Sequence, residues 1–127
     1  MPIFMLTITI WWMDVVLGDA FKMAVDNSPE TKINRYGFFV LPMDEVLTTV
    51  AIDFCGRSSF VFDVYFYRDQ IGGLSTEMIE EFWYLFSQKA MMNFIAKLEY
   101  GKNDHHVVEG LFKCAARSLR MTPGKPI

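Results

Sequence analysis

Two stretches in which apolar and polar side chains alternate constrain the fold of this chain most. From residue 60 to 66 the phenylalanine and valine side chains share one side of the backbone, and from residue 92 to 100 the pattern recurs before Gly101. A two-residue period is typical of a strand that buries one face. The β-prone residues 33–41 and 49–54, separated by Pro42, predict two earlier strands. We expect the first three strands to form a meander, with the fourth strand later in the chain.

Three other stretches carry apolar residues at helical spacing. The first runs from Met13 to Ala24 and stops at a turn signal over residues 26–29, and the second begins at Thr76 and Glu77 after two glycines. The third runs from about Asp104 to Leu119. Prolines and a glycine make residues 121–127 an irregular tail. The apolar run from Ile3 to Met13 is about half of the ~20 residues that a membrane-spanning helix needs, so we expect a buried or misplaced strand there.

Composition limits the classes of partner. The chain has 127 residues, a net charge of −3 and a pI near 5.3, without the basic surface that nucleic acid requires. A single domain is expected. An apolar fraction of 52% is high for this length and predicts contact with other subunits. Cys55 and Cys114 have no paired spacing, which indicates two small buried hydrophobic residues and a reducing, cytoplasmic location.

The only two histidines are adjacent, at His105 and His106, and Glu109 follows on the same helical face together with Lys113. Imidazole and carboxylate without thiolate suit manganese, iron, nickel or zinc. The alternative is a solvated surface cluster in which Asp104 only caps the helix. Spacing alone leaves both interpretations open.

The longer string around these histidines carries a resemblance. Residues 101–113, GKNDHHVVEGLFK, resemble nearly residue for residue the second metal motif of imidazoleglycerol-phosphate dehydratases. Two further segments agree in order and spacing: residues 35–37 leading to 42–45, and residues 53–57. The resemblance covers roughly residues 14–119 and identifies the chain as similar to the C-terminal half of that family.

The resemblance implies a fold and a chemistry. The fold would be α+β, a four-stranded sheet with helices packed on one face, half of a duplicated dehydratase fold of the ribosomal protein S5 domain 2-like type. The family dehydrates imidazole glycerol phosphate to imidazole acetol phosphate in L-histidine biosynthesis. Two Mn²⁺ ions stabilise an imidazolate at a subunit interface, and the enzyme assembles from trimers. We therefore expect a phosphorylated imidazole substrate, a homo-oligomer, and neither nucleic acid nor membrane as partner.

The resemblance also assigns roles to residues. His105, His106 and Glu109 would be catalytic metal ligands, and Glu81 stands where the family carries another ligand, His or Glu. Arg35 and Arg57 match the arginines that hold the substrate phosphate, a task that suits the forked guanidinium. Lys113 matches a lysine that contacts the phosphate.

The chain departs from the family before Asp14, where residues 6–13, LTITIWWM, contain neither histidine nor carboxylate. Residues 3–10 can be encoded ATA TTT ATG TTG ACG ATC ACC ATN, and the frame that starts at the third base reads Ile-Tyr-Val-Asp-Asp-His-His, which resembles the missing first motif. We therefore expect an aberrant, frameshifted segment over residues 1–13, a dehydratase domain over 14–120 and the irregular tail over 121–127.

Three functions follow from the sequence. The chain could be a dehydratase whose active site other subunits or a correct N-terminal sequence complete. It could be an inactive fragment that retains metal binding and self-association. The third possibility, a small α+β binding module with a chance histidine pair, is disfavoured by the three ordered motifs.

Overall fold

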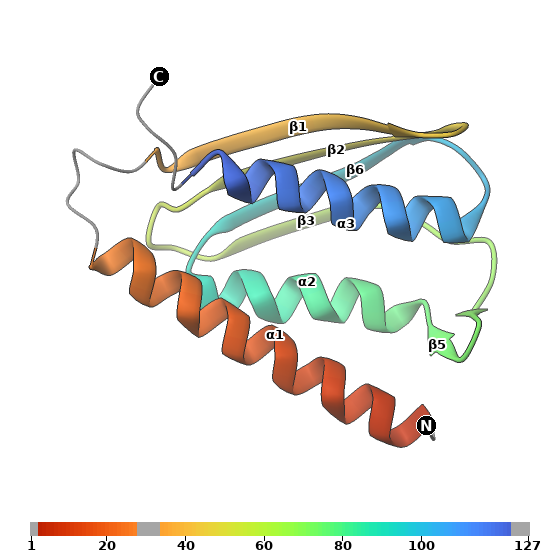
Figure 1. Cartoon of the computed structure of the whole chain (residues 1–127), viewed down its shortest axis with the longest axis horizontal. Helices are drawn as coiled ribbons and strands as arrows, with labels where there is room; N and C mark the ends of the chain where they lie inside the picture. Colours follow the sequence, from red (N-terminus) through yellow and green to blue (C-terminus); the bar gives the residue numbers. More distant parts are fainter. Residues whose placement is uncertain (1–2, 28–33, 123–127) are drawn as a thin grey trace.

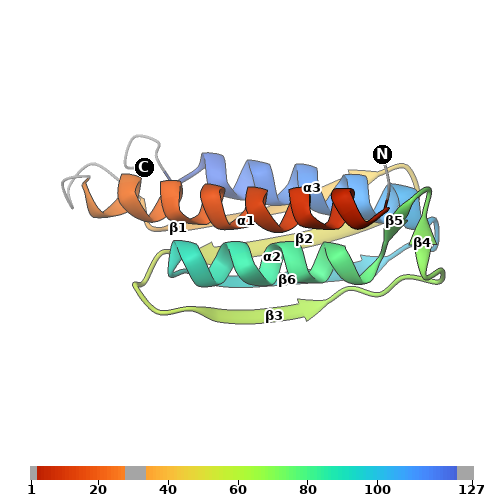
Figure 2. The same ribbon diagram turned by 90° about the horizontal axis from the view of Figure 1, so that it is seen from below.

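We describe the fold from a computed structural model, which defines residues 3–27 and 34–122, with side chains from Trp12 onward. The helices are α1 (Ile3–Asp26), α2 (Glu77–Ala90) and α3 (Asp104–Arg120). The main strands are β1 (Tyr36–Met43), β2 (Val46–Asp53), β3 (Ser59–Asp63) and β6 (Asn93–Tyr100), and two short strands, β4 (Gln70–Ile71) and β5 (Leu74–Ser75), form a hairpin. The three helices lie on one side of the sheet, and α1 stacks on α2 (Figures 1 and 2).

The four main strands form one sheet in the order β1-β2-β6-β3. The expected α+β fold with four strands and helices on one face is confirmed, but the meander is wrong. β6 separates β2 from β3, pairing antiparallel with β2 and parallel with β3. A parallel pair needs a crossover connection, and α2 supplies it between β3 and β6.

Pro42 does not end a strand as the sequence suggested. It lies inside β1, opposite Leu47 of β2. β1 is an edge strand, where a residue without an N–H group leaves the ladder on its inner side intact. Asp44 and Glu45 then form the tight turn to β2, and Asp44 adopts a left-handed backbone conformation with φ of 52°.

The alternation that predicted the strands does separate a buried from an open sheet face. Along β2, Val46, Thr48, Val50 and Ile52 are buried, and along β6 so are Phe94 and Ala96. The buried face packs against α2 and α3 through aromatic contacts. Trp83 stacks on Phe94 with ring centroids 5.0 Å apart and lies 4.9 Å from Phe112.

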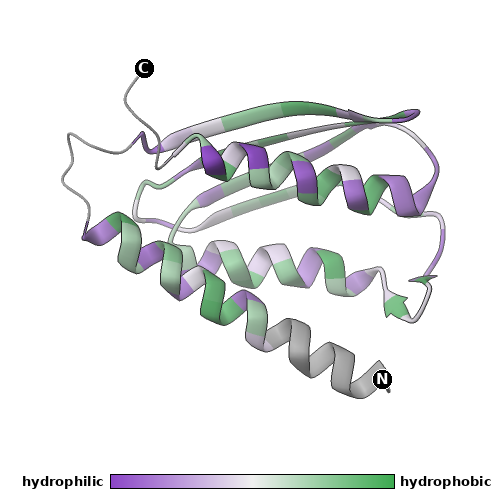
Figure 3. Ribbon diagram, viewed as in Figure 1, coloured by the Kyte–Doolittle hydropathy of each residue, from purple (hydrophilic) through white to green (hydrophobic). Residues whose placement is uncertain are grey.

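The expectation of a strand at Ile3–Met13 is wrong, because the backbone of α1 is helical from Ile3 to Asp26. Within the part whose side chains are described, the buried stripe of α1 contains Asp14 and Gly18, and Phe21 packs edge-on against Phe86 of α2 at 5.5 Å. Gly18 is required there, because a Cβ at this position would lie 2.5 Å from the Cβ of Lys89. Apolar residues also extend round the outer side of the helix (Figure 3).

The two cysteines differ in their exposure to solvent. Cys114 is buried as expected, whereas Cys55 is exposed and its Sγ donates to the carbonyl of Arg57 at 3.3 Å. The expectation of a buried Cys55 is therefore wrong. The expected helices over 13–24, from Glu77, and from Asp104 are confirmed, and of the expected tail the structure describes only residues 121 and 122. Within the described residues, no helix combines the length and the hydropathy needed to cross a membrane.

Candidate metal centre

The start of α3 is fixed by a cap and by a loop contact. The side chain of Asn103 accepts a hydrogen bond from the backbone N–H of His106 at 3.2 Å, so Asn103 is the N-cap. Asp104 is not the cap. It is buried, and its carboxylate accepts from the backbone N–H groups of Tyr67 at 3.0 Å and Arg68 at 2.9 Å. Asp104 therefore ties the loop after β3 to the first turn of the histidine helix.

His105, Glu109 and Lys113 form a line on the outer side of α3, one helical turn apart, as their spacing predicted. His105 Nε2 lies 3.5 Å from one carboxylate oxygen of Glu109, and Lys113 Nζ lies 2.7 Å from the other. The ammonium of Lys113 lowers the pKa of Glu109 below its ordinary value. Glu109 is therefore a carboxylate with one oxygen held by Lys113 and the other beside the imidazole.

A hollow of about 270 Å³ opens beside this line. Ile71 and Leu74 of the β4-β5 hairpin form one wall, and His105, Val108 and Glu109 form the other. Small-molecule sites combine apolar walls with a few convergent polar groups. The hollow is thus a place where an apolar ring could lie next to His105 and Glu109.

His106 points to a different pair of carboxylates, those of Asp44 and Glu45 in the β1-β2 turn. Its Nδ1 lies 3.0 and 3.2 Å from the two oxygens of Glu45, and its Nε2 lies 3.6 Å from Asp44 Oδ2. One potential ligand atom from each of these three residues lies within 4.8 Å of the others, and no other such group occurs in the described part of the chain. The backbone amide of Glu45 and, to a smaller extent, the hydrogen bond with His106 lower the pKa of Glu45 below its ordinary value.

Asp44 and Glu45 lie in the segment 42–45 that resembles the family, but the sequence predicts no role for either residue. Their proximity to His106 depends on a hairpin 61 residues earlier in the chain that ends beside the start of α3. The turn itself could have indicated that these two residues belong to the site. An Asp-Glu pair between two expected strands puts two carboxylates at one end of the sheet.

Glu81 lies apart from the histidine cluster. It is exposed on α2, and its charge acts on the buried Asp14 of α1. Among the described residues Glu81 belongs to no group of three possible ligands. The structure therefore does not bring Glu81 together with His105, His106 and Glu109 within one copy of the chain.

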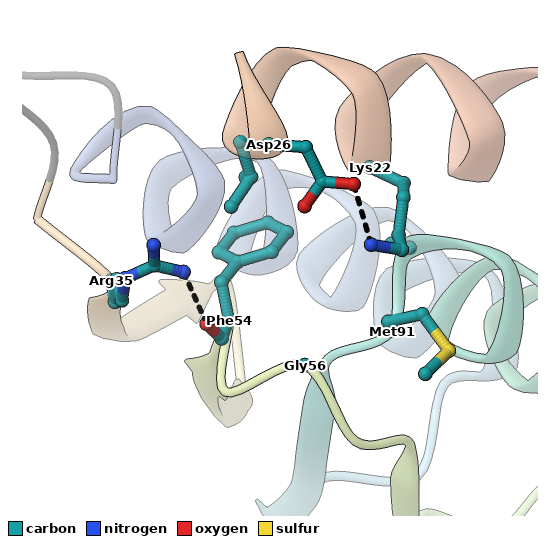
Figure 4. Close-up of a pocket in the computed structure, with 8 residues that line it drawn as sticks. Lys22, Asp26, Arg35, Phe54, Gly56 and Met91 are labelled. Carbon is teal, nitrogen blue, oxygen red and sulfur yellow. Dashed lines mark hydrogen bonds and ion pairs between the residues drawn. The ribbon is translucent and has the colours of Figure 1, made fainter. Parts of the chain in front are cut away.

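Arg35 and Arg57 lie at the opposite end of the sheet from the histidines. Arg35 Nη1 donates to the carbonyl of Phe54 at 3.0 Å, and its side chain borders a hollow of about 20 Å³ together with Lys22 (Figure 4). That hollow has room for about one water molecule. Arg57 is exposed in the turn just after Phe54.

The distance between these two groups of residues follows from the length of β1. Arg35 precedes the first residue of this strand, whereas Asp44 and Glu45 follow its last residue and contact His106. The strand has eight residues, which at about 3.3 Å per residue puts its ends about 23 Å apart. Lys113 lies between them, about 12 Å along α3 from His105.

The residues at the start of α3 fit a divalent cation in their chemistry. Imidazole nitrogens and carboxylate oxygens are ligands that manganese, iron and zinc accept. His105 with Glu109, and His106 with Asp44, each bring a nitrogen and an oxygen within 3.6 Å. Each pair supplies two of the four to six ligands that such a cation takes. The fold and site thus define an α+β protein with one group of possible metal ligands, formed by His106, Asp44 and Glu45, beside a second histidine-carboxylate pair, His105 and Glu109.

Comparisons with known proteins agree with this class. Residues 11–119 match the family model described as imidazoleglycerol-phosphate dehydratase. The dehydratase of Clostridium botulinum (strain Alaska E43 / Type E3) is 49% identical over 106 residues, which are 84% of this chain and 53% of that protein. The dehydratase of Lactiplantibacillus plantarum is 43% identical over 84% of this chain and 54% of its own length. This chain belongs to the imidazoleglycerol-phosphate dehydratase family.

Solved structures place the fold in the same family. The crystal structure of imidazoleglycerol-phosphate dehydratase from Staphylococcus aureus matches with a TM-score of 0.89 at 27% identity, covering 94% of this chain and 69% of that one. The enzyme from Pyrococcus furiosus, in complex with (S)-C348, matches with a TM-score of 0.79 at 28% identity, over 94% and 65%. The chain spans about half the length of the relatives whose sequences it matches.

Proposed function

We propose that this chain is a dehydratase subunit that converts imidazole glycerol phosphate to imidazole acetol phosphate in L-histidine biosynthesis, with Mn²⁺ as cofactor and the cytoplasm as location. The observation that carries the proposal is the divergence of the two adjacent histidines. Each imidazole has its own carboxylate neighbour, Glu109 or Asp44, within 3.6 Å. Two adjacent residues can thereby serve two different ions, with two ions to each complete site.

The proposed roles of the residues are those that the resemblance to the family implies. His105, His106 and Glu109 would hold Mn²⁺, and Glu81 would contribute from another copy of the chain. When bound, Mn²⁺ would act as a Lewis acid toward the substrate's imidazole ring and so ease loss of a carbon-bound proton. Lys113 keeps Glu109 ionised and oriented. Arg35 and Arg57 would fork onto the phosphate oxygens.

The site has to combine residues from different copies of the chain. A molecule with one imidazole ring, a three-carbon chain and one phosphate is far shorter than the ~23 Å between the arginine and histidine ends of one sheet. The arginines and the histidines of one copy therefore cannot hold the same molecule. A homo-oligomer, assembled from trimers as in the family, would bring the two ends together.

This geometry suggests a complementation experiment. One variant carries His105→Ala and His106→Ala, and the other carries Arg35→Ala and Arg57→Ala, so each loses one half of every site. Co-refolding equal amounts should restore on the order of a quarter of wild-type dehydratase activity, because a quarter of randomly assembled sites draws both intact halves. Each variant refolded alone is the control and should be inactive. An active wild type with no restoration would place the whole site within one copy.

A second candidate function is an inactive fragment that retains metal binding and self-association. It is favoured by the sequence before Asp14, which has no histidine or carboxylate from Leu6 to Met13. Calorimetric titration of the wild type with Mn²⁺ separates the two candidates when combined with the activity assay. Mn²⁺ uptake that His105→Ala weakens, without product formation, would support the fragment. The coding DNA before residue 14 tests the proposed frameshift directly, since it must encode Asp-Asp-His-His in another frame.

A further inference from the structure

The contacts of His106 determine which of its ring nitrogens carries the proton. Nδ1 faces both carboxylate oxygens of Glu45, at 3.0 and 3.2 Å, which is hydrogen-bond distance. Nε2 lies 3.6 Å from Asp44 Oδ2, which is beyond that distance. The two nitrogens therefore have unequal partners. Nδ1 is held by the carboxylate of Glu45, and Nε2 makes no hydrogen bond to Asp44.

An ionised carboxylate can only accept hydrogen bonds. Glutamate, whose ordinary pKa is about 4.3, is a carboxylate at neutral pH, and both oxygens of Glu45 lie within hydrogen-bond distance of Nδ1. Nδ1 must then be the donor, since an unprotonated Nδ1 would set its lone pair against those of Glu45. In neutral histidine a proton on Nδ1 leaves a free lone pair on Nε2. Nε2 is thus the nitrogen available to a cation.

The backbone on both sides of this contact is fixed. The N–H of His106 is bonded to the Asn103 side chain at the start of α3, and Met43 pairs with Val46 on either side of the Asp44-Glu45 turn. Neither element needs to move for the contact to form. The Glu45 carboxylate can therefore hold the imidazole ring in one orientation as well as in one tautomer.

We propose that Glu45 is a positioning residue that holds His106 in the Nδ1–H tautomer and directs Nε2 toward a bound cation. The value of this arrangement for catalysis rests on the proposed function, but the tautomer itself does not. A carboxylate behind a metal-binding histidine fixes the ring and makes it more basic, and loss of such a partner costs 10- to 100-fold in metal affinity. Glu45 would act through His106 without contacting the substrate.

Nitrogen-15 NMR of the two imidazoles tests the tautomer without metal or substrate. The chain has only two histidines, so four ring nitrogens account for the whole signal, and His105 is the internal reference. At about pH 8.5, two units above the ordinary histidine pKa, the wild type should show His106 with a protonated Nδ1 and an unprotonated Nε2. Glu45→Ala should move the His106 pair toward the Nε2–H tautomer that free histidine favours and leave His105 unchanged.

Asp44→Asn is the matched control, because it removes the same charge from the same turn on the side of Nε2. His106 should keep its Nδ1–H tautomer in this variant. A loss of the tautomer in both variants would mean that only the local charge matters, and would overturn the inference. Glu45 is half exposed on a turn, so Glu45→Ala should leave the fold intact, and Glu45→Asp, which restores the carboxylate, should recover part of the Nδ1–H signal.

Titration with Mn²⁺ provides the second readout. Glu45→Ala should weaken binding 10- to 100-fold, whereas Glu80→Ala, at an exposed carboxylate on α2, should not. The inference is overturned by an Nε2–H His106 in the wild type, by an Nδ1–H tautomer that persists in Glu45→Ala, or by equal Mn²⁺ affinity in wild type and Glu45→Ala. A wild type that forms no product but shows the expected tautomer and affinities contradicts the dehydratase proposal and supports the role of Glu45.

Discussion

Replacing Asp14 by asparagine should stabilise this protein at neutral pH and leave its stability in acid unchanged. Asp14 is fully buried in α1 where this helix packs on α2, and neither of its carboxylate oxygens has a hydrogen-bond partner among the described residues. Burial raises the pKa of Asp14 from 3.8 to about 6; the amide of Val15 opposes this shift, and the charge of Glu81 adds to it. A buried charge without a partner is costly.

The size and pH range of the effect follow from that pKa. One pKa unit corresponds to about 1.36 kcal/mol, so a pKa of about 6 instead of 3.8 makes the folded state about 3 kcal/mol less stable once the carboxyl is ionised. The folded pKa is the higher one. The favourable contribution of the protonated form is therefore complete below pH 3.8 and is lost as pH rises to about 6. The asparagine side chain does not titrate, so Asp14→Asn should gain about 1.6 kcal/mol at pH 5 and about 3 kcal/mol above pH 7.

Urea unfolding followed by tryptophan fluorescence at pH 4, 5, 6 and 7.5 measures this difference. Other titrating groups, including Glu45 and Glu109, cancel when the variant is subtracted from the wild type. Ala20→Ser, at an exposed position on the same helix, is the control. It changes no titratable group, so its difference from the wild type should not depend on pH. A constant difference between wild type and Asp14→Asn from pH 4 to 7.5 would refute the reasoning, because it would mean that burial does not perturb Asp14.

Three further predictions concern other parts of the structure. Gly37→Ala would place a Cβ against a backbone carbonyl of α3 and should lower the stability by about 2–3 kcal/mol, measured as a lower melting temperature. Gly73→Ala, which has open space around its Cβ, should leave the melting temperature unchanged. Equal melting temperatures for the two variants would contradict the close approach at Gly37. Asp104→Asn should weaken the two hydrogen bonds from the loop amides of Tyr67 and Arg68 and lower the stability by about 1–2 kcal/mol. Hydrogen exchange at these two amides should become faster, and unchanged exchange would contradict the prediction. Lys113→Met should raise the pKa of Glu109 toward 4.5, measured by a carbon-13 NMR titration. An unchanged pKa would show that the ammonium of Lys113 does not cause the lowered pKa of Glu109.

Local periodicity predicted most of the elements and could not predict how the strands are ordered. The stretches at residues 60–66 and 92–100 each show which side of a strand is buried. They carry no information on which strands are neighbours, because β3 and β6 meet only through the crossover of α2. The run Ile3–Met13 misled for a related reason. Its β-branched residues favour a strand by propensity, yet the helix that contains Asp14 and Gly18 continues back through it.

The sequence likewise predicted one part of the candidate site and missed the other. Helical spacing placed His105, Glu109 and Lys113 in one line, and the structure contains that line. Spacing also grouped His106 with them, whereas its ring turns to Asp44 and Glu45, which a hairpin distant in sequence brings to the start of α3. Contacts within one helix can be read from one sequence. Contacts between a turn and a helix depend on the sheet that joins them.

Two exposed apolar surfaces, one on α1 and one on the open face of the sheet, also support the proposed assembly. On the outer side of α1, Trp12, Met13 and Val16 are each at least half exposed. On the open face of the sheet the register aligns four apolar residues in one row across all strands: Phe38, Ala51, Ile95 and Val61. Monomeric proteins rarely expose contiguous apolar surfaces of this kind. The proposed assembly would have to cover one or both surfaces while it brings the arginine end of one copy to the histidine end of another. An assembly that buries them without joining those ends would stabilise the fold and leave the site inactive.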